Sequence, residues 1–246
     1  MVLQRGIGLT FNTAALVLRP PLRLLSSRRW LGAERLPRTG GFVVAANHVS
    51  WADPVTLADF LVAQGLQPRI LAKEALFRVP VVAQVLRGIG AVPVLRGSAD
   101  AGRALTAAQD AVRSGECVVI YPDGTLTKDP EGWPMAGKTG AARVALTTGA
   151  PVVPVATWGA HLLLPRTGRP RLWPRPRMEV LVGDPVDLSA WEGRPLTAEV
   201  LRQATDAVVD AVAALLAELR GVPAPPRWDP RTGTRRQLPE PREEQA

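Results

Sequence analysis

A short apolar run, Phe42-Val43-Val44-Ala45-Ala46, is the feature that most constrains how this chain can fold. The run shows no alternation of polar and apolar residues and stops abruptly at a polar stretch, so it predicts a strand that is buried on both faces. A buried strand needs a sheet around it and helices to cover that sheet. The chain has 246 residues, which is enough for one domain with a core of that size.

Other apolar runs alternate with segments of helical periodicity. Strands are expected at 69–72, 116–121, 152–156 and 178–182, and helices at 54–65, 98–114, 139–148 and 197–220. The elements between 33 and 221 predict a single α/β domain. In residues 222–246, Pro, Arg and Glu dominate and little can be buried, so we expect a disordered tail.

Residues 1–32 combine apolar side chains at helical spacing with dispersed arginines. The uncharged run at 6–18 is too short to span a bilayer, and no clear signal-peptide cleavage site follows it. We expect an amphipathic segment that lies on a membrane surface with its arginines toward lipid headgroups. The alternative is a helix that packs onto its own domain.

A polar stretch, Asn47-His48-Val49-Ser50-Trp51-Ala52-Asp53, directly follows the first predicted strand. The end of a strand is where an α/β sheet exposes its ligand-binding edge. Asp53 opens the next helical segment, where the helix dipole stabilises a carboxylate. A hydrogen bond from His48 to Asp53 would fix the imidazole tautomer and leave the other ring nitrogen free as a base. The alternative is a helix-capping acid beside an unrelated histidine.

This stretch resembles the NHxxxxD signature of the glycerolipid acyltransferases, and the resemblance covers about residues 33–190. It implies a mostly parallel sheet flanked by helices. His48 would be the general base and Asp53 would orient it, with Asn47 and Ser50 beside the substrate. A thioester donor is already activated, and the chain has no G-x-S-x-G motif that would supply a serine nucleophile.

Later blocks resemble the other motifs of that family. The substrate-binding positions that they imply are Lys73, Arg96, Asp123, Gly124, Thr125, Lys138 and Pro154. Two departures concern the block Pro122–Thr127. Asp123 stands where the family usually has Glu, and Leu126 stands where it has a phosphate-binding Arg. If the acceptor carries a phosphate, we expect Lys73 and Arg96 to bind it first, with help from Lys128 or Lys138.

Composition and spacing exclude several other classes of protein. A single Cys117 rules out an internal disulfide, and two histidines make a histidine-based metal site improbable, so no metal is expected. Gly132–Thr139 fits the P-loop pattern, but a polar, turn-forming segment precedes it where a P-loop would follow a strand. The net charge of +8 suits an anionic partner, and no nucleic-acid-binding motif is present.

The sequence therefore predicts an O-acyltransferase of phospholipid synthesis. It would move a fatty acyl group from acyl-CoA or acyl carrier protein to 1-acylglycerol-3-phosphate, without a cofactor, on the cytoplasmic face of the cell membrane. The enzyme would be peripheral or monotopic. One alternative keeps this chemistry but uses a glycolipid or aminolipid acceptor. Another is a catalytically idle protein that binds a membrane surface or a nucleic acid.

Overall fold

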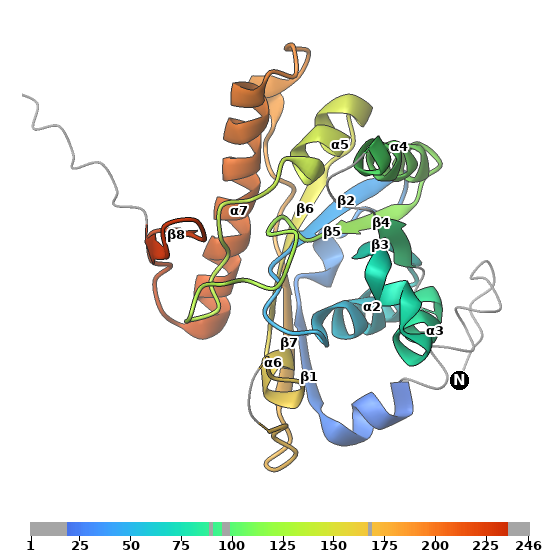
Figure 1. Cartoon of the computed structure of the whole chain (residues 1–246), viewed down its shortest axis with the longest axis vertical. Coiled ribbons are helices and arrows are strands. Elements are labelled where there is room, and N and C mark those ends of the chain that lie inside the picture. The colour runs from blue at the N-terminus through green and yellow to red at the C-terminus, as the bar shows by residue number, and fades with distance from the viewer. Residues whose placement is uncertain (1–18, 89–90, 95–98, 167–168, 236–246) are drawn as a thin grey trace, which may run out of the picture.

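The structure is a computed structural model, and it describes residues 19–88, 91–94, 99–166 and 169–235. Figure 1 shows a central sheet with helices on both sides, which confirms the α/β prediction. Its strands are β1 (Ser27–Leu31), β2 (Phe42–Ala46), β3 (Pro68–Lys73), β4 (Ala91–Val94), β5 (Cys117–Ile120), β6 (Val152–Trp158) and β7 (Arg177–Val182). The α-helices are α2 (Asp53–Ala63), α3 (Pro80–Gly88), α4 (Ala99–Arg113), α5 (Gly140–Thr148), α6 (Ala160–Leu163) and α7 (Ala198–Arg220).

The strand order is β1-β7-β6-β2-β5-β3-β4. The five strands from β6 to β4 are parallel, whereas β7 runs antiparallel to β6 and β1 runs parallel to β7. Five strands therefore end at one edge of the sheet, which we call the carboxyl edge. Because β7 and β1 run the other way, they begin at this same edge.

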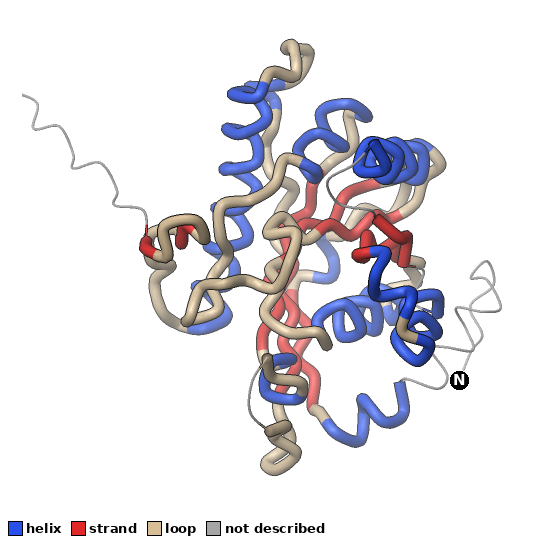
Figure 2. Tube along the Cα trace, in the orientation of Figure 1, coloured by secondary structure: helices blue, strands red, loops and turns tan. Residues whose placement is uncertain are grey.

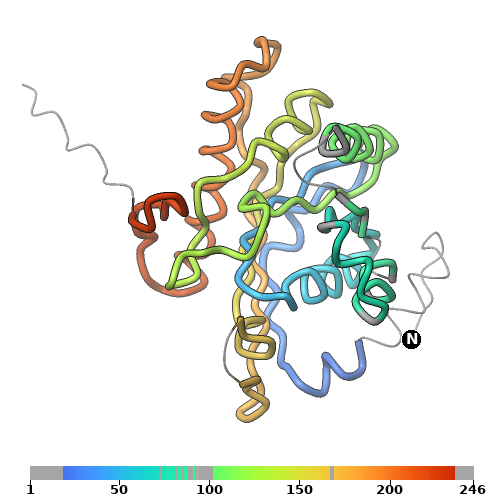
Figure 3. Tube along the Cα trace, viewed as in Figure 1, coloured from blue at the N-terminus to red at the C-terminus, as the bar shows by residue number. Residues whose placement is uncertain are grey.

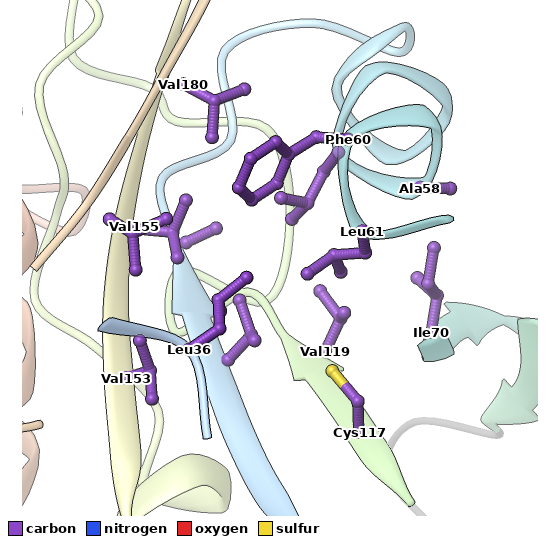
Figure 4. Packing of buried hydrophobic residues seen from close by; sticks show 14 of the residues in the cluster. Leu36, Ala58, Phe60, Leu61, Ile70, Cys117, Val119, Val153, Val155 and Val180 are labelled. Carbon is purple, nitrogen blue, oxygen red and sulfur yellow. The ribbon is translucent and has the colours of Figure 1, made fainter. Parts of the chain in front are cut away.

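Two apolar clusters cover the two faces of the sheet. On one face α2 packs Leu57, Phe60 and Leu61 against the strands, and Figure 4 shows Phe60 and Leu61 facing Val119 and Val155. On the other face α4, α5 and α7 pack small and β-branched side chains against β2, β5 and β6. Figure 2 shows α2 on one side of the strands and α4, α5 and α7 on the other. The sheet is thus enclosed, as the apolar run at β2 predicts.

The first strand differs from the prediction of a separate N-terminal segment at 1–32. Ser27–Leu31 pairs with β7, so the sheet already begins within that segment. Arg19 and Arg28 both form ion pairs with Asp59 of α2, at 2.6 and 2.8 Å, so these two arginines face the domain instead of lipid. Residues 1–18, which carry most of the predicted amphipathic segment, lie outside the described residues. No helix in the described parts of the chain is long and apolar enough to cross a bilayer.

The C-terminal segment also differs from the predicted disordered tail. After α7, residues 222–235 fold back and form a short hairpin of β8 (Trp228–Asp229) and β9 (Thr234–Arg235). Arg227 is paired with Asp206 and Asp210 on α7, which fixes the hairpin to that helix. Residues 236–246 of the predicted tail lie outside the described residues.

Candidate active site

His48 and Asp53 form a hydrogen-bonded pair at the carboxyl edge. His48 follows the end of β2, and Asp53 is the first residue of α2. His48 Nδ1 lies 3.0 Å from Asp53 Oδ2, and the Asp53 side chain has no exposed surface. With the Nδ1 hydrogen donated to the carboxylate, His48 Nε2 is left as a proton acceptor. This is the arrangement that the spacing of the two residues predicts.

The backbone holds the Asp53 carboxylate in place. Its Oδ2 atom also accepts hydrogen bonds from Val49 N at 2.6 Å and from Ser50 N at 2.7 Å. The position at the start of α2 adds the favourable field of the helix dipole. Three donors to one oxygen fix the orientation of the carboxylate, so that it can stabilise an imidazolium when His48 takes up a proton.

Tyr121 and Thr127 complete the surroundings of His48, and sequence reasoning missed both roles. The Tyr121 ring stacks on the imidazole with 4.3 Å between ring centroids. Thr127 N donates to His48 O at 2.8 Å. β2 and β5 are neighbours, so residues that follow them meet at the carboxyl edge. The apolar run that ends at Tyr121 was the signal that could have placed this ring beside His48.

Asn47 and Ser50 have their side chains engaged inside the protein. Asn47 bridges β2 to β6, because its amide donates to Thr157 O at 2.9 Å and accepts from Thr157 N at 2.7 Å. Ser50 Oγ donates to Leu164 O at 2.7 Å and lies 3.2 Å from Ala160 O. Both residues shape the loop that carries His48. Contact with substrate, which we expected of them, remains a prediction.

The turn after β5 places Gly124 beside Lys138. Gly124 has φ of +65°, and a Cβ atom there would lie 2.9 Å from Lys138 Cδ and 3.4 Å from its Nζ. The positive φ favours glycine at this position, and the close approach shows that the Lys138 side chain lies over the turn. Lys138 and Thr125 are exposed, whereas Leu126 is buried. An exposed cation over an open turn is suited to an anionic group.

Asp123 is a buried acid in the same turn. Its Oδ1 accepts a hydrogen bond from Met135 N at 3.0 Å, and its Oδ2 has no partner. Loss of solvent raises the pKa of Asp123 to about 7, helped by the negative charge of Asp129 and opposed by the Met135 amide. At 5% exposure, Asp123 supports the loop from within.

The remaining predicted residues are less closely tied to the site. Lys73 ends β3 at the carboxyl edge, and Arg96 lies outside the described residues. Pro154 is buried in β6, where its Cγ would lie 3.1 Å from a Cβ at Gly183. The structure therefore puts Lys73 at the same edge as His48 and places Pro154 inside the sheet. Their roles in binding substrate stay predictions.

The loop from Thr127 to Met135 is held by the C-terminal segment, and Figure 3 shows the two lying side by side. Met135 forms a bridge with Trp228, and Arg235 Nη1 lies 2.8 Å from the buried Asp129 Oδ2. Arg220 lies between two tryptophan rings, 4.1 Å from the centroid of Trp133 and 4.4 Å from that of Trp158. This loop reaches His48 through Thr127. The C-terminal segment therefore supports the site.

The P-loop pattern at 132–139 does not form a phosphate cradle. Its amides are engaged internally, since Trp133 N, Met135 N and Lys138 N donate to Asp129, Asp123 and Pro122 respectively. Within the described residues, no cluster of three His, Cys, Asp or Glu side chains could hold a metal ion.

Comparison with known proteins identifies the family. A family-wide pattern described as Acyltransferase matches residues 28–158. The 1-acyl-sn-glycerol-3-phosphate acyltransferase of Bacillus subtilis is 31% identical over 176 residues, which cover 72% of this chain and 82% of the relative. The chloroplastic enzyme BAT2 of Brassica napus, a protein of the same name, is 30% identical over 68% of this chain and 49% of its own length.

A solved structure agrees with these relatives. The 1-acyl-sn-glycerophosphate (LPA) acyltransferase PlsC of Thermotoga maritima superposes with a TM-score of 0.63 and 25% identity, covering 89% of this chain and 81% of that one. The chain therefore belongs to the acyltransferase family and is an acyltransferase enzyme.

Proposed function

We propose that the enzyme transfers a fatty acyl group from a thioester to the free hydroxyl of 1-acylglycerol-3-phosphate, giving phosphatidic acid. The observation that carries the proposal is the His48–Asp53 pair, with Nδ1 bonded to a buried carboxylate. The names of the relatives from Bacillus subtilis and Brassica napus support the choice of acceptor.

The reaction needs one base and no covalent enzyme intermediate. His48 Nε2 removes the proton of the acceptor hydroxyl as the oxygen attacks the thioester carbonyl. Asp53 stabilises the imidazolium through Nδ1. When the carbon–sulfur bond breaks, the imidazolium returns the proton to the departing thiolate. General-base assistance of this kind contributes about 10²–10⁴ in rate.

Lys138 is the described cation best placed to bind the phosphate of the acceptor. Its side chain is exposed and packs over Gly124, in the turn that follows β5. Leu126, which replaces the arginine of the family, is buried and contributes no charge. Lys73 at the end of β3 and Arg96 are the further candidates for phosphate contact that the resemblance implies.

The buried Leu126 also favours a second candidate, in which the acceptor is a glycolipid or an aminolipid without a phosphate at this position. In either case, we propose acyl-CoA or acyl carrier protein as the donor and the cytoplasmic face of the cell membrane as the location, with the enzyme bound peripherally or monotopically. The exposed arginines and the net charge of +8 support an anionic lipid surface as a partner.

Purified His48→Ala, Asp53→Asn and Lys138→Ala variants test the proposal with labelled acyl-CoA and acyl carrier protein. We expect His48→Ala to abolish transfer to lysophosphatidate and Asp53→Asn to reduce kcat strongly. Lys138→Ala should raise KM about ten- to a hundredfold, the range expected when a charge-assisted contact is lost. His161→Ala removes the other histidine and serves as the control.

Two results would change the assignment. Near-wild-type turnover by a folded His48→Ala protein would exclude the catalytic role of this residue. If Lys138→Ala, Lys73→Ala and Arg96→Ala all leave the kinetics with lysophosphatidate unchanged, while an uncharged lysolipid is a good acceptor, the glycolipid or aminolipid acceptor takes first place.

A further inference from the structure

Large apolar side chains that are strongly exposed gather at the carboxyl edge of the sheet. Across the described residues, they are Leu24, Trp51, Val79, Val82, Leu164, Leu172, Trp173 and Val222. All but two follow β2, β3 or β6. Leu24 precedes β1, and β1 begins at this edge. Val222 follows α7, whose last residue, Arg220, packs on Trp158 at the end of β6.

Among the described residues, the opposite edge of the sheet lacks such side chains. Described segments there, at 37–41, 64–67, 114–116, 149–151 and 183–197, contribute none of the strongly exposed large apolar residues. An asymmetry of this kind marks an interaction surface, because single exposed apolar residues would be scattered over both edges.

The most exposed large apolar side chain of the described residues, Trp173, lies in the segment 169–177, which we call the arginine–tryptophan tip. Trp173 is 84% exposed and Leu172 is 53% exposed. Arg175 donates to Ser26 O at 2.9 Å and also to Arg23 O, and Ser27 N donates to Pro176 O at 3.0 Å. These bonds place the tip against the segment that carries Leu24. In Figure 1 the tip lies beyond α6, at the same end of the molecule as the helix at 19–25.

The tip and its neighbouring helix are basic. The exposed arginines are Arg23, Arg169, Arg171, Arg175 and Arg177. The sequence between 165 and 178 contains no acidic residue. An exposed tryptophan and leucine among arginines match the interface of an anionic bilayer, where aromatic rings sit at headgroup level and arginines meet the phosphates.

The residues just before the tip form hydrogen bonds with the loops that carry or contact His48. Leu164 O accepts from Ser50 Oγ at 2.7 Å, in the loop between His48 and Asp53. Arg166 Nη1 donates to Thr127 O at 2.5 Å, and Thr127 N in turn donates to His48 O. A ligand bound at the tip therefore lies at the same edge of the sheet as the general base, His48.

We propose that the carboxyl edge is the face that docks on an anionic phospholipid bilayer, with the arginine–tryptophan tip and Leu24 entering the interface. His48 then faces the membrane, and an acceptor with one acyl chain can react without leaving it. This inference rests on the proposed function, because a water-soluble acceptor would not require such a face. A nucleic acid could also meet the arginines and stack a base on Trp173, but it gives no reason for the exposed Leu24 and Leu172 beside them.

A labelled cysteine tests the contact in the full-length protein. Cys117 is the only cysteine of the chain and is buried, so a Trp173→Cys variant takes a polarity-sensitive fluorophore at one site. We expect its emission to shift to the blue on addition of phosphatidylglycerol vesicles. Arg194→Cys, at the opposite edge, should show no shift. Equal shifts at both positions, or none at 173, would overturn the proposal.

Partition measurements test the energetics. Leu172→Ala combined with Trp173→Ala should weaken vesicle binding about ten- to a hundredfold. Arg169→Gln combined with Arg171→Gln should weaken it about fivefold per charge on anionic vesicles and not on neutral ones. The matched control is Arg38→Gln combined with Arg194→Gln, two exposed arginines at the opposite edge, which should leave binding unchanged. Binding that resists the apolar pair but is displaced by heparin would identify a polyanion as the partner and refute the docking.

Activity separates this inference from the proposed function. The Leu172/Trp173 double variant should lose transfer to lysophosphatidate held in vesicles and keep transfer to a short-chain lysophosphatidate in free solution. If the fluorophore at 173 enters vesicles while no acyl transfer is found with any acceptor, the proposed function fails and the docking stands. If the enzyme is fully active on vesicles while the fluorophore at 173 does not enter them, the docking fails and the proposed function stands.

Discussion

The ion pair between Arg235 and Asp129 shows how much the C-terminal segment contributes to the free energy of unfolding. The Asp129 side chain has no exposed surface, and its Oδ2 lies 2.8 Å from Arg235 Nη1. Removal of one partner from a buried ion pair costs about 3–5 kcal/mol. Arg235 is 22% exposed, and Asp129 Oδ1 also accepts from Glu131 N at 2.7 Å, so solvent and backbone offset part of the loss. We therefore expect Arg235→Ala to lower the free energy of unfolding by about 2–3 kcal/mol.

Urea unfolding of four proteins checks this value: the wild type, Arg235→Ala, Asp129→Asn and the double variant. The double variant should be more stable than Arg235→Ala alone, because it no longer buries a carboxylate without its cation. Arg231→Ala is the matched control in the same hairpin, since its side chain is 87% exposed and, among the described residues, is paired with Asp229 alone. It should cost less than about 0.5 kcal/mol. If Arg235→Ala costs no more than the control, the segment does not hold the loop.

Three further predictions follow from buried and exposed polar groups. Asp123 has a raised pKa of about 7, so its contribution to stability is full at acid pH and is lost as pH rises towards and past 7. Asp123→Asn should remove this decline, which unfolding at pH 5 and pH 8 will show. Asn47→Ala leaves Thr157 N and O without partners inside the protein and should cost about 2–4 kcal/mol in thermal or urea unfolding. Lys138→Ala should raise KM for lysophosphatidate more than Lys128→Ala does, because Lys138 packs over Gly124; steady-state kinetics compare them.

Much of the fold could be predicted because its signals are local. The buried strand at β2, the helix from Thr197 to Arg220 and the pairing of His48 with Asp53 all depend on residues within one element or one turn. Thr197 caps α7 by accepting from Val200 N, as its position in the sequence suggests.

What the sequence did not predict depends on partners that are distant in the chain. β1 is an edge strand with two arginines, and their acids, Asp59 and Glu179, come later in the sequence. The C-terminal hairpin has the composition of a disordered tail, yet its arginines find acids on α7 and in the active-site loop. The sequence shows that Asn47 is polar, but it does not show that the Asn47 amide bonds to the backbone of Thr157, 110 residues later.

The catalytic pair and the proposed phosphate-binding residues come from different parts of the chain. The base and its acid come from one strand and the helix that follows it, β2 and α2, within six residues of sequence. Gly124 and Lys138 come from another such unit, β5 and α5. The two units touch, because Thr127 N of the second unit donates to His48 O, so Thr127 has to be kept whatever the acceptor. Exposed positions of the second unit, such as Lys138, are therefore where a change of acceptor should arise without loss of the His48–Asp53 pair, if the proposed phosphate contact of Lys138 holds.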